Sequence, residues 1–347
     1  MSIVLPRRGQ KGSHIMLEKQ GGSMTTRIRL VVAVLAAGVM TGPGTLASEQ
    51  DVTLRYQWAQ GQTLRYRHTQ QSTAAISGLP GGMGDMTVNS TMSQVFKVVA
   101  ENVAADGAVT LRFSYEAMRM EMTSPMVNLS YDSAAPDKAA DPSGGTMKDM
   151  FSGLIGESFT VVMTPVGEVQ KIEGMGRIVE KVFSKLPQDP ATAGMLNGLK
   201  NSFSDDSIKS TLSQGFPRLP ERAVKPGDTW NSEFTTTNPM LGALTTSIAA
   251  TLKALEGSGA NQVARIGTKV IMKPDPKSPG TNPMGLTVQM NNGAAEGDLS
   301  FDVAKGRLQK ADIRSTLDMS MSGTGPDGSA MNMKTQVKAV FTLELLQ

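Results

Sequence analysis

The sequence contains no cysteine and only two histidines among its 347 residues. Without cysteine, the chain forms no disulfide and has no thiolate nucleophile or thiolate metal ligand. His14 lies in an N-terminal stretch that we set aside below, so a single imidazole, that of His68, remains for chemistry. One such chain cannot assemble a three-histidine zinc site or a two-histidine iron site.

Common catalytic and phosphate-binding motifs are also missing. The sequence has no G-x-S-x-G, S-x-x-K, H-E-x-x-H or G-x-x-x-x-G-K-[ST] segment. We therefore expect no catalytic residue, no cofactor and no metal site of a common enzyme class. The sequence favours a protein that is not an enzyme.

Residues 24–47 show the pattern of a secretory signal peptide. Arg27 and Arg29 precede an apolar run over 30–40, and 45–47 form a small-x-small cleavage site. The run is shorter than the roughly 20 residues that cross a bilayer. We expect an exported protein, periplasmic or secreted, with no transmembrane anchor after cleavage.

Residues 1–23 precede this signal and carry no periodic apolar pattern. We interpret them as lying outside the natural protein, either through a start site chosen too far upstream of Met24 or as an added leader. Residues 1–47 hold six of the 34 Lys and Arg and one of the 31 Asp and Glu, which leaves 28 basic and 30 acidic side chains. A net charge of −2 without a dense basic run argues against a nucleic-acid partner.

Alternating apolar and polar residues dominate the remaining chain and predict strands. The expected strands lie at 64–77, 86–102, 109–122, 159–164 and 168–172, and strand character returns from 244–272 to the C-terminus. Helical spacing is confined to the middle of the chain. Helices are expected at 147–155, from Ile178 to Leu186, at 191–203, and after a cap at Asp205 or Asp206.

The order of turn signals predicts two similar β units, 48–173 and 220–347, separated by a helical insert at 174–219. Gly61 and Gly227 open the two units, and the segment 167–171 (GEVQK) matches 306–310 (GRLQK). The predicted fold class is α+β, mainly antiparallel β, with curved sheets that form a half-barrel or clam. An internal duplication explains the repeated order, although two unrelated β meanders can share such turns.

Methionine is unusually frequent, and several methionines are spaced by two residues. This spacing places them on one face of a strand. The groups are Met118, Met120 and Met122; Met319 and Met321; and Met331 and Met333. They fit three interpretations: an ordinary core, a surface for an apolar ligand, or thioether ligands for Cu(I). His68 lies in the polar stretch 65–68, and we expect it at the surface or against a partner.

Turn and strand motifs across most of the chain resemble an uncharacterised family of exported bacterial proteins, a domain of unknown function. The resemblance rests on 54–56 (LRY), 61–66 (GQTLRY), 167–169 (GEV), 219–220 (LP) and 224–230 (VKPGDTW). It implies an exported, β-rich protein and supplies no catalytic residues.

These patterns together predict an exported, non-enzymatic envelope protein. In the first hypothesis it binds a hydrophobic small molecule or lipid in a concave sheet lined by the methionine groups. In the second it is a structural or interaction module that docks an envelope protein. A third hypothesis is Cu(I) binding by the methionines.

Overall fold

A computed structural model describes residues 51–79, 84–140, 145–184, 208–209, 212, 216–238, 241–277, 287–324 and 330–346. The chain divides into two units, 1–46 and 47–347, and all described residues belong to the second. The expected signal peptide and residues 1–23 therefore lie outside the described residues. Among the described residues, no helix has the length and hydropathy needed to cross a bilayer.

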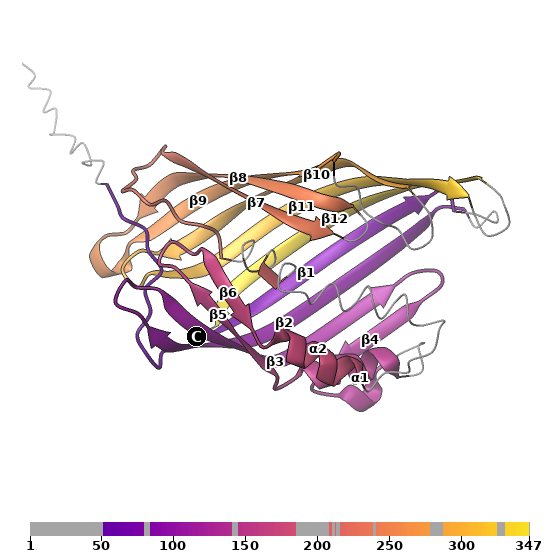
Figure 1. Ribbon diagram of the computed structural model, residues 1–347, viewed down its shortest axis with the longest axis horizontal. Coiled ribbons are helices and arrows are strands. Elements are labelled where there is room, and N and C mark those ends of the chain that lie inside the picture. Colours follow the sequence, from indigo (N-terminus) through magenta and orange to yellow (C-terminus); the bar gives the residue numbers. More distant parts are fainter. Residues whose placement is uncertain are drawn as a thin grey trace, which may run out of the picture. The chain divides into compact units, whose positions relative to one another are not determined.

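The described residues form one antiparallel sheet of twelve strands (Figure 1). The strands are β1 (Thr63–Ser77), β2 (Met86–Val103), β3 (Val109–Thr123), β4 (Asn128–Asp132), β5 (Ser158–Met163), β6 (Val169–Glu173), β7 (Thr229–Asn238), β8 (Gly242–Glu256), β9 (Val263–Pro274), β10 (Thr287–Asp302), β11 (Arg307–Thr324) and β12 (Ala330–Leu346). Their order is β6-β5-β3-β2-β1-β12-β11-β10-β9-β8-β7, and β4 pairs with β3 beside this path. The predicted fold class, mainly antiparallel β with a few helices, is confirmed.

Two α-helices, α1 (Thr146–Leu154) and α2 (Met175–Phe183), pack against each other, and both are labelled in Figure 1. The α1 residue Phe151 contacts Tyr131 of β4, while α2 lies against β5. In α2, the buried Met175, Ile178 and Val182 recur every three or four residues and form one apolar face. The helix ends at Phe183, three residues earlier than the sequence suggested. The helix expected at 191–203 lies outside the described residues.

The two halves of the sheet have the same strand order. The first half runs β1-β2-β3-β5-β6, the second runs β7-β8-β9-β10-β11, and β12 pairs with both β1 and β11 to join them. The opening turns also match. Gly61 N–H donates to the Ala100 carbonyl oxygen and Gly227 N–H donates to the Leu252 carbonyl oxygen, each over 2.8 Å. A bulge follows Ala100 in β2 and Leu252 in β8.

The second matched turn differs in length between the two halves. Gln170 in β6 and Gln309 in β11 occupy the same place in the matched segments, and each lacks a paired residue on the preceding strand. On the preceding strands, however, Val162 pairs with Lys171 while Ser300 pairs with Lys310. The turn before β11 is thus one residue longer than the turn before β6, which shifts the incoming strand.

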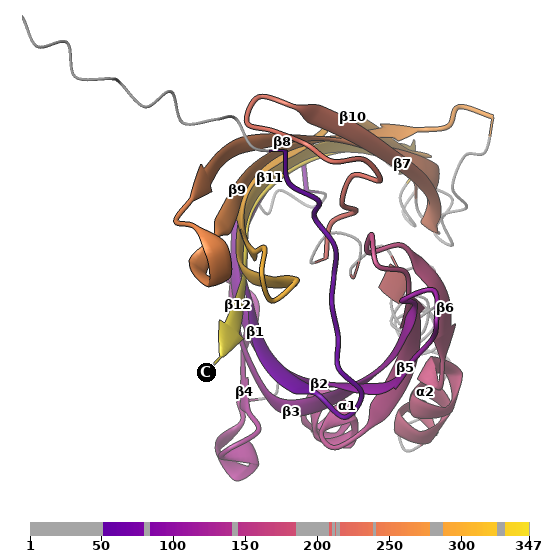
Figure 2. The ribbon, with the colours of Figure 1, turned by 90° about the vertical axis from the view of Figure 1, so that its left-hand side faces the viewer.

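The sheet curls around one face, which we call the inner face (Figure 2). Paired residues of an antiparallel sheet point to the same side, so the register shows which side chains share this face. One row of paired residues crosses five strands: Met118, Gln94, His68, Leu343 and Ala311. The core lies on this face.

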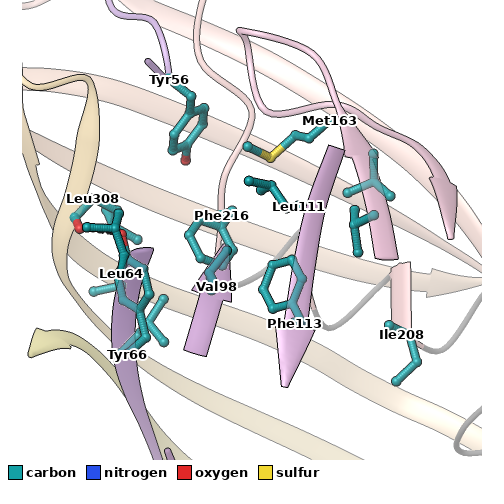
Figure 3. Packing of buried hydrophobic residues seen from close by; sticks show 14 of the residues in the cluster. Tyr56, Leu64, Tyr66, Val98, Leu111, Phe113, Met163, Ile208, Phe216 and Leu308 are labelled. Atoms are coloured by element: carbon teal, nitrogen blue, oxygen red, sulfur yellow. Dashed lines mark hydrogen bonds between the residues drawn. The ribbon is translucent and has the colours of Figure 1, made fainter. Parts of the chain in front are cut away.

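Aromatic side chains pack the core near one end of the sheet (Figure 3). Phe216, near the end of the segment predicted as the helical insert, makes edge-to-face contacts with Tyr66 at 5.4 Å and with Tyr56 and Phe113 at 6.3 Å between ring centroids. Such geometry is the preferred one for paired rings. Phe216 therefore joins the N-terminal segment to β1 and β3.

Candidate functional site

A cavity of about 330 Å³ lies beside this core on the inner face. Its walls come from five strands (β1, β2, β3, β11 and β12), from Phe159 of β5, from α1 and from the side chains of Ile208, Leu212 and Phe216. The lining residues are His68, Gln70, Met92, Gln94, Phe96, Phe113, Ser114, Tyr115, Met118, Phe151, Leu154, Phe159, Ile208, Leu212, Phe216, Ala311, Ile313, Phe341 and Leu343. The volume falls in the range of small-molecule sites.

Aromatic rings form a large part of the cavity wall. The sequence has 16 Phe, Tyr and Trp residues, and seven of them line this cavity. Phe113 stacks on Phe159 with 5.3 Å between ring centroids, and the His68 ring stacks on Phe341 at 6.2 Å.

Three neutral polar side chains meet on one wall of the cavity, and we call His68, Gln70 and Gln94 the polar patch. Gln94 pairs with His68 across β2 and β1, and Gln70 follows His68 by two residues on the same face. The Gln94 amide donates to the Met92 sulfur over 3.4 Å. Within the described part of the chain, the His68 imidazole and the Gln70 amide make no hydrogen bond.

The described lining of the cavity includes no charged side chain. Burial lowers the pKa of His68, so its imidazole is neutral at pH 7. Burial also raises the pKa of Tyr115 to about 12, which keeps its hydroxyl protonated. His68 is partly buried in the cavity wall, because β1 alternation turns it to the same face as the buried Tyr66, and the expected surface or partner contact of its ring stays a prediction.

The first group of methionines lies at and beside the cavity. Met118 lines it together with Met92 of β2. Met120 pairs with Met92 and Met122 pairs with Ser90, so both share the inner face but lie further along β3. A β-bulge at Glu116, which has no paired residue on β2, brings these methionines to the inner face. Because of the extra residue, Met118 lies on the same face as Phe113, although five residues separate them.

The second group of methionines lies on the same face but away from the cavity. Met321 pairs with Met333 across β11 and β12, Met331 pairs with Gly323, and Met319 pairs with Met290 of β10. On β11, Met319 and Met321 follow the cavity position Ile313 by six and eight residues, and six residues correspond to about 20 Å along a strand. The structure therefore does not bring the two groups into one site. Within the described part of the chain, no cluster of three His, Asp or Glu side chains is placed to hold a metal.

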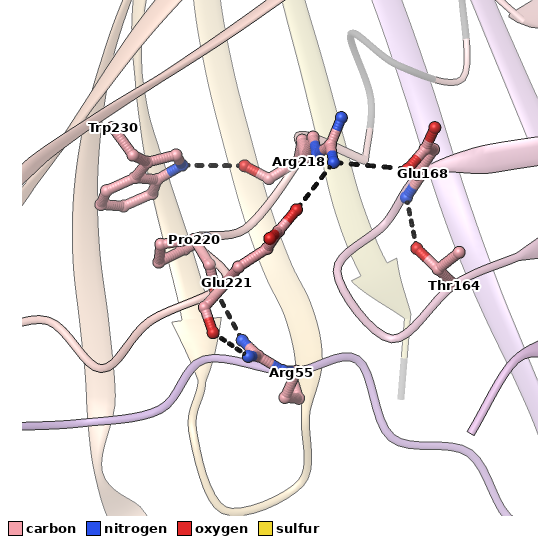
Figure 4. Close-up of polar contacts among 7 residues, drawn as sticks. All are labelled: Arg55, Thr164, Glu168, Arg218, Pro220, Glu221 and Trp230. Carbon is pink, nitrogen blue, oxygen red and sulfur yellow. Dashed lines mark hydrogen bonds and ion pairs between the residues drawn. The ribbon is translucent and has the colours of Figure 1, made fainter. Parts of the chain in front are cut away.

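The motifs that carried the family resemblance meet at one end of the sheet, in what we call the clasp (Figure 4). Arg55 donates to the carbonyl oxygens of Pro220, over 2.6 Å, and Glu221. Arg218 forms ion pairs with Glu168 at 3.4 Å and Glu221 at 3.0 Å. The Trp230 indole donates to the Arg218 carbonyl oxygen over 2.9 Å. These contacts tie together turns from both halves, so the motifs have a structural role.

Sequence reasoning missed Gln70, Gln94 and the aromatic wall. Alternation already placed Phe113 and Tyr115 on one side of their strand, together with Leu111. What the pattern lacked was the register, which sets Gln94 opposite His68 and puts Phe341 beside Gln70. Strand pairing over long sequence separations has no local signal.

Known structures resemble this one only distantly, and no curated protein matches the sequence. A structure described as lipid–protein interactions in lipovitellin is 8% identical with a TM-score of 0.43, and covers 84% of this chain. This chain spans 26%, about a quarter, of the lipovitellin chain. DynF from the dynemicin biosynthesis pathway of Micromonospora chersina is 9% identical with a TM-score of 0.17, with 85% of each chain covered.

An outer-membrane channel from Pseudomonas putida F1 is 10% identical with a TM-score of 0.19, and covers 84% of this chain and 97% of that one. The resemblance to an uncharacterised family is confirmed at the level of the sequence. Residues 106–308 match the model of a family described as a family of unknown function (DUF6263), and this match spans more than half of the chain. The protein therefore belongs to the DUF6263 family.

Proposed function

We propose that this protein binds a small hydrophobic molecule in the aromatic cavity of the inner face and carries it unchanged. The observation that supports this function is the cavity itself: about 330 Å³, with Phe113, Phe159, Phe216 and Phe341 in its walls. A preformed apolar cavity with a few polar groups is typical of a ligand site. The signal-peptide pattern at 24–47 favours a place for this binding in the cell envelope or outside the cell.

The hydrophobic effect gives the expected strength of binding. Removing apolar surface from water contributes about 25 cal/mol per Å², so a ligand that buries about 250 Å² gains about 6 kcal/mol. This corresponds to a dissociation constant of tens of micromolar before losses from ligand ordering. Such affinity suits a reversible carrier.

N-phenyl-1-naphthylamine, an uncharged dye that fluoresces in apolar surroundings, tests this function. We expect saturable fluorescence with purified wild-type protein. Gln70→Trp fills the cavity from β1 and is expected to weaken dye binding at least tenfold. Gln71→Trp is the matched control, because Gln71 is exposed on the opposite face of the same strand, and its dye binding is expected to equal that of the wild type.

Both variants must show the wild-type far-ultraviolet circular dichroism before their binding is compared. Equal dye binding by wild type and folded Gln70→Trp contradicts a ligand site in this cavity. Native mass spectrometry of the protein purified from its own host gives a second readout, with a bound hydrophobic compound as the expected result.

A further inference from the structure

The polar patch adds hydrogen-bonding groups to a cavity that is otherwise lined mainly by apolar side chains. His68, Gln70 and Gln94 lie next to one another on β1 and β2, and all three line the cavity. An amide offers both a donor and an acceptor, and so does a neutral imidazole. The Gln70 amide and the His68 ring have no hydrogen-bond partner within the described part of the chain.

We propose that the cavity selects an uncharged hydrophobic ligand with one carbonyl or hydroxyl group, which hydrogen-bonds to the polar patch while the remainder packs on the aromatic wall. This inference rests on the proposed function and specifies its ligand class. A ligand oxygen at the patch bonds to polar groups that are partly exposed and have no protein partner for this bond, in place of water. A site of this kind discriminates strongly against an analogue that lacks the polar group.

The charge distribution around β1 excludes an anionic ligand from the class. Arg65 and Arg67 alternate with Tyr66 and His68, and are exposed on the face away from the cavity. Arg65 forms an ion pair with Glu116 at 2.6 Å on that face. A carboxylate inside the cavity thus meets no cation among the described lining residues, and burying an unpaired charge is unfavourable.

Three naphthalene derivatives of similar size test the preference: 2-ethylnaphthalene, 2-acetylnaphthalene and 2-naphthoate. Dissociation constants are measured by displacement of N-phenyl-1-naphthylamine at pH 7.5. We expect the acetyl compound to bind about tenfold more tightly than the ethyl compound, and 2-naphthoate to bind more weakly than both.

The double variant Gln70→Leu/Gln94→Leu removes both amides while keeping similar volume. We expect a reduced preference for the acetyl compound, because His68 is then the remaining member of the patch, with affinity for 2-ethylnaphthalene kept or increased. Gln71→Leu, on the opposite face of β1, is the control and is expected to keep the wild-type preference. If the double variant does not fold, the single variant Gln70→Met serves, and a reduced preference for the acetyl compound is expected.

The outcomes separate this inference from the proposed function. If none of the three compounds binds to the wild type, both the cavity function and the ligand class are wrong. If the ethyl and acetyl compounds bind equally, or 2-naphthoate binds most tightly, the cavity function stands and the ligand class is wrong. An unchanged preference in the folded double variant also contradicts the role of the polar patch.

Discussion

At the scale of single residues, Gly167 shows how closely the N-terminal segment packs on a turn between strands. Its φ of +85° lies in the left-handed region, which favours glycine. A Cβ atom at this position would lie 2.6 Å from the Tyr56 ring and 3.1 Å from the Pro217 carbonyl oxygen. Tyr56 is buried and donates to that same oxygen over 3.1 Å, so neither neighbour can move easily.

Gly167→Ala is therefore expected to lower the free energy of unfolding by about 2–4 kcal/mol, from backbone strain and from displacement of Tyr56. Gly61→Ala is the matched control. Gly61 has a φ of +79° but no atom within 4 Å of a Cβ there, so only the backbone cost of about 1 kcal/mol is expected. Urea unfolding of both variants measures the difference. Equal losses in the two variants would mean that the contact with Tyr56 contributes nothing.

His68 gives the protein a pH dependence whose direction follows from burial. Because burial lowers the pKa of the folded imidazole, the unfolded chain, with a pKa near 6.5, takes up its proton first as the pH falls. Stability from this group is thus present above about pH 6.5 and is lost as the pH falls toward the lowered folded value. Its neighbours on the adjacent strands, Gln94 and Leu343, do not titrate, and Tyr115 has its pKa raised to about 12.

His68→Phe is expected to remove this dependence. The measurement is the free energy of urea unfolding at pH 7.5 and 5.5 for both proteins. We expect the wild type to lose more stability than His68→Phe between the two values. A loss of the same size in both proteins would show that other groups set the acid sensitivity.

At the scale of elements, alternation located the strands well but said nothing of their partners. The expected strand 86–102 became β2 (Met86–Val103), and 109–122 became β3 (Val109–Thr123). Their period-two pattern is a local property of the sequence, and so the strand bounds were predictable. The pairing of β1 with β12 joins residues more than 250 positions apart, such as Ser77 with Lys334. Nothing local encodes such a pairing.

The bulge in β3 is a second feature that periodicity alone does not reveal. Leu111, Phe113 and Tyr115 share a face, and after Glu116 this face passes to Met118 and its successors. Period-two spacing is visible within each group, but it does not show that the two groups face the same side. One extra residue changes which side chains reach the cavity.

Deletion of Glu116 is expected to turn one of the two groups to the outer face. We expect an unfolding free energy lower by about 3 kcal/mol or more, together with loss of dye binding. Glu116→Ala keeps the bulge and removes only a partly exposed ion pair with Arg65, so a loss of about 0.5 kcal/mol is expected. Wild-type stability and dye binding in the deletion variant would contradict this account of the bulge.

At the scale of the whole described unit, the clasp holds segments from both halves at one end of the curved sheet. The N-terminal segment bonds to matched turns of each half, through Tyr56 N–H to the Pro165 carbonyl oxygen at 2.7 Å and Gln57 N–H to the Gly306 carbonyl oxygen at 2.9 Å. Figure 2 shows this indigo segment crossing between the halves. Arg55 adds two bonds to the segment that follows the helical insert.

Arg55→Ala is expected to lower the unfolding free energy by about 1–2 kcal/mol, because two backbone carbonyl groups lose their charged donor. Arg222→Ala provides the comparison. Arg222 is more exposed and pairs with Asp228 at 2.8 Å, so its removal is expected to change stability by less than about 0.5 kcal/mol. Urea unfolding again gives the measurement, and a larger effect for Arg222→Ala would contradict the clasp.

The position of β12 between the two halves also has a consequence for how the chain reaches this state. A ribosome delivers β1 long before β12, so β1 spends most of synthesis with one hydrogen-bonding edge vacant. A vacant edge of fifteen residues is a template for pairing with another copy. Charged side chains at 65 and 67 disfavour pairing with another copy at one end of that edge. The stretch from 69 to 77 has no charged residue. A newly made chain therefore depends on rapid arrival of its last strand, or on a chaperone, to avoid aggregation.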